Sequence, residues 1–273
     1  MQDILSVLTF VVPIMYLLTT TFYMTHFFSN SDWSQKAKTP SLVVTLLIHL
    51  VYLSVMTAQN GYPPIASLYQ VMTMIAFTLI ASYLIIELST KADETGSFVI
   101  SFATIFQGLS SIYINQVRFV DPALKNWVIE LHIISALLGY SGIAIAGIYG
   151  FLYILLFRQI QANHFGLLYQ RLPNLEIMER MCYHAVTQGF SYLTIAIIAG
   201  AIEIPKHHHN NSMLLSDPKL IGIMLIWVAY GVSLLMRLKF GWNGKRMAIL
   251  FVAGLLIMFF SITFFNLFSP RFH

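Results

Sequence analysis

Histidine is the residue type with which this chain could do the most chemistry. Neutral imidazole is a good ligand for haem iron and for several divalent metals. Cys182 is the only cysteine, so an internal disulfide, a cysteine-rich metal site and a Cys-x-x-Cys redox pair are excluded. The sequence has no Gly-rich phosphate loop, nucleophile elbow or paired carboxylates, and we expect it not to be an enzyme. The nine histidines are His26, His49, His132, His164, His184, His207, His208, His209 and His273.

His132 stands near the start of an apolar run that predicts a helix over Trp127–Phe157. Small residues follow it at helical spacings of three and four, and these are Ser135, Gly139, Gly142, Ala146 and Gly150. They share one helical face, which lets a second helix approach closely. His132 is therefore expected to point toward other helices, where a buried ionisable group is a functional candidate. The alternative is a structural histidine bonded to a neighbouring carbonyl group.

Two other histidine sites lie outside the apolar runs. The tract His207-His208-His209 follows Glu203, and a His-rich tract can bind metal. A short exposed tract with only incidental metal affinity is the alternative. His273 is the last residue of the sequence, and a terminal histidine taken alone is expected to be a frayed, solvated end.

A membrane explains the composition of the chain. Of its 273 residues, 58% are hydrophobic and 10% are charged, against roughly 25% charged residues in ordinary soluble domains. The apolar residues form blocks of about 17–25, the length that crosses a hydrocarbon core of roughly 30 Å. We predict an all-α, polytopic membrane helix bundle that forms a single domain over residues 1–273. About eight spans are expected, at Ile4–Phe28, Ser41–Ala58, Ala66–Leu88, Ser97–Ile114, Trp127–Phe157, Tyr183–Ile202, Leu220–Leu238 and Met247–Phe268.

The charges between the spans predict the orientation of the bundle. One set of loops carries ten basic residues, and the opposite set, with the C-terminus, carries five. Since the side with more Lys and Arg faces the cytoplasm, both termini are expected outside. The richer set is Lys36, Lys38, Lys91, Arg158, Arg171, Arg180, Arg237, Lys239, Lys245 and Arg246, and the poorer set is Arg118, Lys125, Lys206, Lys219 and Arg271.

Two regions outside the spans also need an interpretation. The start of the chain lacks the basic region of a signal peptide, so the first span is expected to be retained. The longest break, Arg158–Cys182, is expected to be an ordered loop between helices, with an amphipathic surface stretch as the alternative. The whole chain is then a multi-pass protein, expected in the bacterial inner membrane.

Four stretches, in their order along the chain, carry a resemblance to a known family. They are Gly61–Gln70, Trp127–Tyr140, Gln188–Thr194 continuing through Gly200-Ala201, and Ser216–His273. Together they resemble the cytochrome c assembly protein family, the membrane haem handlers that include CcsA/ResC-like, CcmC-like and HemX-like proteins. The first stretch looks like the family's Gly-x-x-Pro...Leu-Tyr-Glu segment, with Gln70 at the acidic position. His132 and His273 fall where the family has its two outward-facing haem-ligating histidines.

The chain departs from the family pattern in two places. The family's outer loop is rich in tryptophan and ends in Trp-Asp-Pro-Lys, whereas the segment between Gly200 and Asp217 contains no tryptophan. CcsA-type members have another histidine near the inner end of the following helix, and Ser233–Arg237 here has none. Both departures are similar to the HemX-like end of the family.

The resemblance implies a haem-handling protein of cytochrome c biogenesis. It would bind or present non-covalent b-type haem at the outer membrane face through His132 and His273, with other membrane subunits of a cytochrome c assembly system as partners and no nucleic acid. Basic residues would offset the charge of the haem propionates, and the candidates are Arg118, Lys125, Lys206 and Arg271. The alternative is a structural or regulatory subunit that keeps the fold but has lost haem delivery. Metal binding by His207, His208 and His209 is a third reading.

Overall fold

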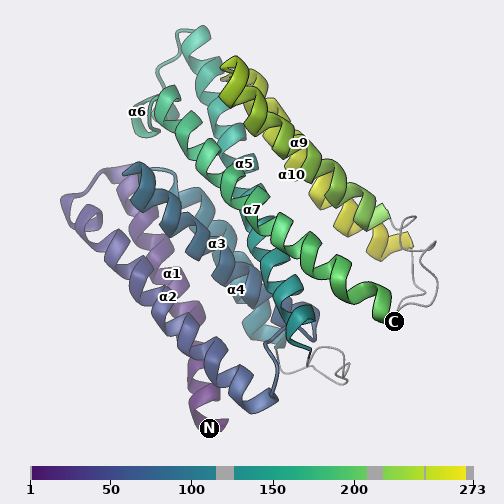
Figure 1. The fold of residues 1–273 in the computed structure, drawn as a ribbon. Helices are drawn as coiled ribbons and strands as arrows, with labels where there is room; N and C mark the ends of the chain where they lie inside the picture. The colour runs from purple at the N-terminus through teal and green to yellow at the C-terminus, as the bar shows by residue number, and fades with distance from the viewer. Residues whose placement is uncertain (1, 115–125, 208–217, 243, 269–273) are drawn as a thin grey trace.

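The computed structural model describes residues 2–114, 126–207, 218–242 and 244–268, and within these ranges every regular element is a helix. Side chains are described for the same residues except 203–207, 218–219 and 261–268. The long helices pack into one bundle, with α3 and α5 in its middle (Figure 1). The helices are α1 (Gln2–Ser29), α2 (Asp32–Asn60), α3 (Leu68–Thr90), α4 (Gly96–Tyr113), α5 (Trp127–Gln161), α6 (Leu167–Arg171), α7 (Leu175–His207), α9 (Pro218–Phe240) and α10 (Lys245–Phe268).

The predicted membrane spans correspond to the long helices. Seven of them, within the described residues, are long and apolar enough to cross a bilayer. The last predicted span coincides with α10, a helix of 24 residues. Successive long helices run in opposite directions, so Gln2 and Phe268 lie at the same end of the bundle (Figure 1). We call this the terminal end. The ten basic residues of the richer set lie toward the opposite end, which we call the basic end. Which end faces the cytoplasm stays a prediction.

The structure corrects the predicted break between Arg158 and Cys182. This stretch is mostly helical rather than a loop, because α5 continues to Gln161, α6 occupies Leu167–Arg171 and α7 already begins at Leu175. The second span also begins earlier than predicted, at Asp32 instead of Ser41. In both places charged residues interrupt the apolar pattern without ending the helix, because they lie at the basic end of the bundle. A hydropathy pattern finds the part of a helix that crosses the bilayer, not the turns that project beyond it.

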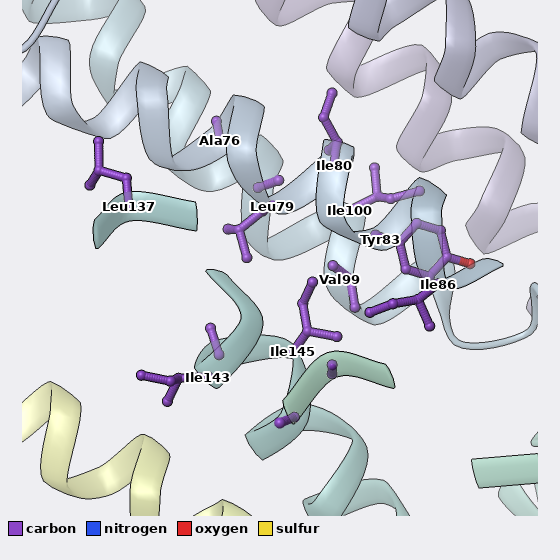
Figure 2. Close-up of a cluster of buried hydrophobic side chains, with 14 of the residues drawn as sticks. Ala76, Leu79, Ile80, Tyr83, Ile86, Val99, Ile100, Leu137, Ile143 and Ile145 are labelled. Carbon is purple, nitrogen blue, oxygen red and sulfur yellow. The ribbon is translucent and has the colours of Figure 1, made fainter. Parts of the chain in front are cut away.

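Apolar side chains of α3, α4 and α5 meet in the centre of the bundle (Figure 2). Leu79 and Ile80 of α3, Ile100 of α4, and Ile143 and Ile145 of α5 are all buried. In a bilayer the lipid is as apolar as these side chains, so close packing and interhelical hydrogen bonds hold such a core, not exclusion from water. The helix pairs must therefore fit closely or carry polar contacts, and both features are present.

A chain of hydrogen bonds joins α1 to α4 through a fully buried histidine. The ring of His49 contacts the Tyr16 hydroxyl through Nδ1 at 2.8 Å and the Thr73 hydroxyl through Nε2 at 3.0 Å. Thr73 donates its only hydroxyl proton to Gln107 Oε1 at 2.7 Å, and Gln107 Nε2 donates to Ser111 at 3.0 Å. Thr73 must then accept from Nε2–H, so Nδ1 is the acceptor and the Tyr16 hydroxyl donates to it. Interhelical hydrogen bonding thus accounts for the buried His49.

Replacing Tyr16 with phenylalanine should destabilise the bundle by about 1–2 kcal/mol, because it leaves Nδ1 of His49 buried without a donor. The measurement is the midpoint of thermal unfolding in mild detergent. Ser54→Ala is the control, since the exposed Ser54 hydroxyl bonds only to the Leu50 carbonyl of its own helix. Equal midpoints for the two variants would contradict a stabilising role for this hydrogen bond.

At the basic end of the bundle an ion pair joins α2 to the segment that follows α3. Lys38 of α2 is completely buried, and its Nζ lies 2.7 Å from Oδ1 of Asp93, which follows α3. Beside this pair the carboxylate of Glu87 accepts hydrogen bonds from the hydroxyls of Tyr23 at 2.7 Å and Thr39 at 2.6 Å. A buried charge without its partner is costly, so these contacts fix how α1, α2 and α3 meet.

The Asp93→Asn variant should be less stable by about 1–3 kcal/mol, because it leaves the Lys38 ammonium buried beside a neutral group. We place the effect at the lower end of the range for buried pairs because the Asp93 side chain is 34% exposed and water can reach it. Asp32→Asn, on an exposed residue in the first turn of α2, should cost less than about 1 kcal/mol. Both are read from unfolding midpoints in detergent, and similar losses in the two variants would refute the role of the pair.

Candidate functional site

His132 lies in the second turn of α5, at the terminal end of the bundle. The helix begins at Trp127, and the side chain of Asn126 caps it by accepting a hydrogen bond from the Val128 amide at 3.0 Å. This cap fixes where the first turn starts, and so which face of the helix carries His132. The histidine is half-buried and turned toward α7, which confirms that it points to another helix.

A single hydrogen bond fixes the tautomer of the neutral His132 ring. Nδ1 lies 2.7 Å from the backbone carbonyl oxygen of Ala196 in α7. A carbonyl oxygen accepts but cannot donate, so the proton sits on Nδ1 and the lone pair on Nε2. Histidines that ligate metals carry this kind of bond, because it orients the ring and makes the other nitrogen more basic. A structural histidine, the alternative given for His132 from the sequence, makes the same bond to a neighbouring carbonyl, so this contact agrees with both roles. In the neutral ring it leaves the Nε2 lone pair available to a metal centre.

Glycines bring the backbone of α7 close enough to make this bond. A Cβ atom on Gly142 would lie 2.5 Å from the Cα of Gly189, and one on Gly139 would lie 2.7 Å from the Leu193 side chain. α5 and α7 consequently form the most extensive helix pair of the bundle. Farther along α5, a Cβ atom on Gly150 would lie 2.7 Å from the Ala248 carbonyl of α10. The predicted face of small residues thus packs against α7 around Gly139 and Gly142, and against α10 farther along α5.

A groove runs beside His132 between the first turns of α5 and the later turns of α7. It encloses about 550 Å³. We call it the α5–α7 groove, and its walls are apolar apart from Asn126 at one end. The residues that line it are Asn126, Trp127, Val128, Leu131, Ile195, Ile198, Ala199 and Ile202.

The third and fourth stretches of the sequence pattern meet where α9 contacts α7. Trp227 of α9 donates from Nε1 to the Thr194 hydroxyl of α7 at 2.8 Å, and its ring stacks on Phe190 at 5.4 Å between centroids. This contact holds α9 against the turns of α7 that precede Ala196. Residues quoted from separate parts of the sequence therefore support one helix surface.

The other predicted site residues lie outside the described part of the chain. His208, His209 and His273 are not described, and neither are Arg118, Lys125 and Arg271. His207 ends α7, and Lys206 belongs to the same helix, but the side chains of both are outside the description. Among the residues whose side chains are described, no three His, Cys, Asp or Glu lie together as a metal site would require.

Sequence reasoning did not find the Ala196 carbonyl. Alanine has no side-chain chemistry, so its type gives no signal, and only the packing of α7 on α5 puts this backbone oxygen next to His132. The groove was missed for a similar reason. Its walls come from two helices that are far apart in the sequence, and each wall alone looks like any apolar helix face.

These observations define a polytopic helical membrane protein with one imidazole held by a backbone carbonyl at the end of the bundle. The chain belongs to the cytochrome c assembly protein family, because the model of that family matches residues 65–273. Proteins named cytochrome c biogenesis protein CcsA are similar to most of its length. The one from Trieres chinensis is 24% identical over 261 residues, covering 84% of this chain and 82% of the relative. The one from Guillardia theta is 25% identical over 238 residues, covering 80% and 78%. The Porphyra purpurea protein is 25% identical over 259 residues, covering 79% and 80%.

The predicted family is thereby confirmed, and with it a role as a membrane protein of cytochrome c biogenesis. The assignment to its HemX-like members stays a prediction.

Proposed function

We propose that this protein binds haem at the terminal end of the bundle and holds or presents it during cytochrome c biogenesis. Nε2 of His132 is the proposed axial ligand. The observation that carries the proposal is the 2.7 Å hydrogen bond from His132 Nδ1 to the Ala196 carbonyl, which leaves the lone pair on Nε2. Imidazole nitrogen is a usual ligand of haem iron.

Haem is cargo in this proposal, and the chain supplies the means to hold it. Val128 stands one helical turn before His132, and Leu131 directly precedes it. Both line the apolar α5–α7 groove. His132 itself does not line the groove, but the apolar walls lie on the same turns of α5 and suit a flat apolar macrocycle. His273 is the proposed second ligand. The covalent attachment of haem to a cytochrome would be made by partners, since the only thiol of this chain, Cys182, is buried.

The test is an absorption spectrum of the protein purified in mild detergent, oxidised and then reduced. A bis-histidine haem gives a sharp pair of bands on reduction, and we expect these bands to vanish in the double variant His132→Ala/His273→Ala. Wild-type protein that shows no such pair of bands after hemin is added, or a double variant with unchanged bands, would refute the proposal.

The second candidate function is a structural or regulatory subunit without haem. The observation that favours it is the lack of tryptophan between Gly200 and Asp217, since the family's outer loop is rich in this residue. This candidate predicts a featureless spectrum in the test above, together with a stable complex with another membrane protein.

A further inference from the structure

A second groove lies between α7 and α9, away from His132. It encloses about 400 Å³, and its walls are apolar. Phe190 lines it from α7, and residues between Trp227 and Leu235 line it from α9. The rings of Phe190 and Trp227 stack at 5.4 Å between centroids, at the end of the groove farther from the basic end. We call it the α7–α9 groove.

The α7–α9 groove is about as long as one leaflet of a bilayer is thick. From Trp227 to Leu235, at 1.5 Å per residue, it extends about 12 Å along α9, and half of a hydrocarbon core is about 15 Å. Trp227 lies near the middle of the span Leu220–Phe240, and Leu235 lies toward its basic end. Val232 and Leu235 are 45% and 56% exposed, so the groove opens to the lipid. An acyl chain of the leaflet at the basic end therefore fits along it.

Arg237 joins α9 to α7 where the groove approaches the basic end. It stands one turn beyond Leu234, which lines the groove. Its Nη1 lies 3.5 Å from Oε1 of Glu179, and its Cζ lies 4.4 Å from the centroid of the Tyr183 ring. A guanidinium carries five N–H donors, and both contacts with Glu179 use Nη1. Since the side chain is 28% exposed, the other donors can reach a phosphate group.

Two further basic residues stand near Arg237. Lys239 lies in the last turn of α9, and Arg180 directly follows Glu179 on α7. Both are exposed, and neither forms an ion pair with a described residue. Trp242 follows α9 and is 41% exposed, and tryptophan prefers the interface between lipid and water. The groove thus ends in three cations at the level of the lipid headgroups.

We propose that the α7–α9 groove binds an anionic phospholipid of the leaflet at the basic end. One acyl chain lies along the apolar walls, and the phosphate lies at Arg180, Arg237 and Lys239. Basic pockets between membrane helices suit anionic headgroups. A zwitterionic headgroup brings a cation of its own to the same place, and an apolar helix of a partner protein leaves the three cations without an anion. The inference does not depend on haem binding.

The test is native mass spectrometry of the full-length protein in detergent, titrated with phosphatidylglycerol or with phosphatidylcholine of the same acyl chains. Phosphatidylglycerol should bind at least about tenfold more tightly, because its net charge is negative. Arg180→Gln/Lys239→Gln should weaken its binding by about tenfold or more. Lys36→Gln/Lys91→Gln is the matched control, since it removes two exposed cations of the basic end that do not line the groove. It should change the affinity by less than about twofold.

A second pair of variants tests the seat of the acyl chain. Val228→Phe/Val232→Phe adds bulk to the α9 wall and should weaken phosphatidylglycerol binding by about tenfold. Val44→Phe/Val51→Phe is its control, because these valines of α2 are equally exposed to lipid and lie outside the groove. It should change the affinity by less than about twofold. Thermal midpoints show whether all four double variants fold equally well.

Three results overturn the proposal. The first is equal affinity of the wild type for the two lipids, which means that the cations do not select the headgroup. The second is equal weakening by the two charge variants, which means that the whole basic end attracts the lipid. The third is binding that ignores Val228→Phe/Val232→Phe, which places the acyl chain elsewhere. A membrane protein that copurifies on this face and is not displaced by phosphatidylglycerol overturns it as well.

Discussion

Replacing His132 with alanine is expected to weaken hemin binding by more than about 100-fold. Loss of a residue that merely hydrogen-bonds to a ligating histidine already costs about 10–100-fold in metal affinity, so loss of the ligand itself should cost more. The measurement is a hemin titration in detergent, followed at the Soret band. The spectrum should also change from six-coordinate to five-coordinate, because one axial nitrogen is gone.

Two controls make this result specific to the ligand. His164→Ala removes an exposed histidine at the basic end and should bind hemin like the wild type. Free imidazole added to His132→Ala should restore the six-coordinate spectrum, because it can occupy the space that the side chain left. If imidazole restores nothing and the affinity falls equally in both variants, His132 is not the ligand.

Gly142→Ala is expected to destabilise the protein by about 2–3 kcal/mol, although alanine is the better helix former. The new methyl carbon would lie 2.5 Å from Gly189 Cα and 2.6 Å from Gly189 N. Both atoms belong to the backbone of α7, so no side-chain rotation can relieve the clash and the two helices must separate. The loss is measured as a fall in the thermal unfolding midpoint.

The Gly142→Ala substitution should also weaken hemin binding at the candidate site. Separating α5 from α7 draws the Ala196 carbonyl away from His132 Nδ1, and we expect hemin affinity to fall about tenfold, as for other losses of an orienting partner. Gly108→Ala is the matched control, since nothing lies within 4 Å of a Cβ atom there. It should gain up to about 1 kcal/mol from helix propensity and leave hemin binding unchanged. A stable Gly142→Ala variant would contradict the close approach of the two helices.

The membrane setting explains why a single helix contact has these effects. Because lipid competes with apolar packing, a helix pair in the bilayer gains its stability from close contact and hydrogen bonds. Gly142 and Gly189 supply the contact, and the bond from His132 to Ala196 uses the proximity that they create. One glycine pair can therefore affect both the stability of the bundle and the chemistry of its end.

The sequence by itself determined the membrane class, the approximate spans and the face of α5 that carries His132. Each of these depends on local composition or on helical spacing, and both can be read from neighbouring residues along the chain. The run from Ser135 to Gly150 marked the packing face because small residues at spacings of three and four have few other reasons to recur.

Tertiary structure alone decided the tautomer of His132, the burial of Lys38 and the hydrogen-bonded chain through His49. Lys38 was expected in a basic loop, yet it lies buried inside α2 because Asp93 arrives from the end of α3 to neutralise it. The Ala196 carbonyl is a backbone group that every residue possesses, so the residue type at this position does not reveal the contact. What matters is which carbonyl the packing of α7 brings next to His132, and packing joins residues that the order of the sequence keeps apart.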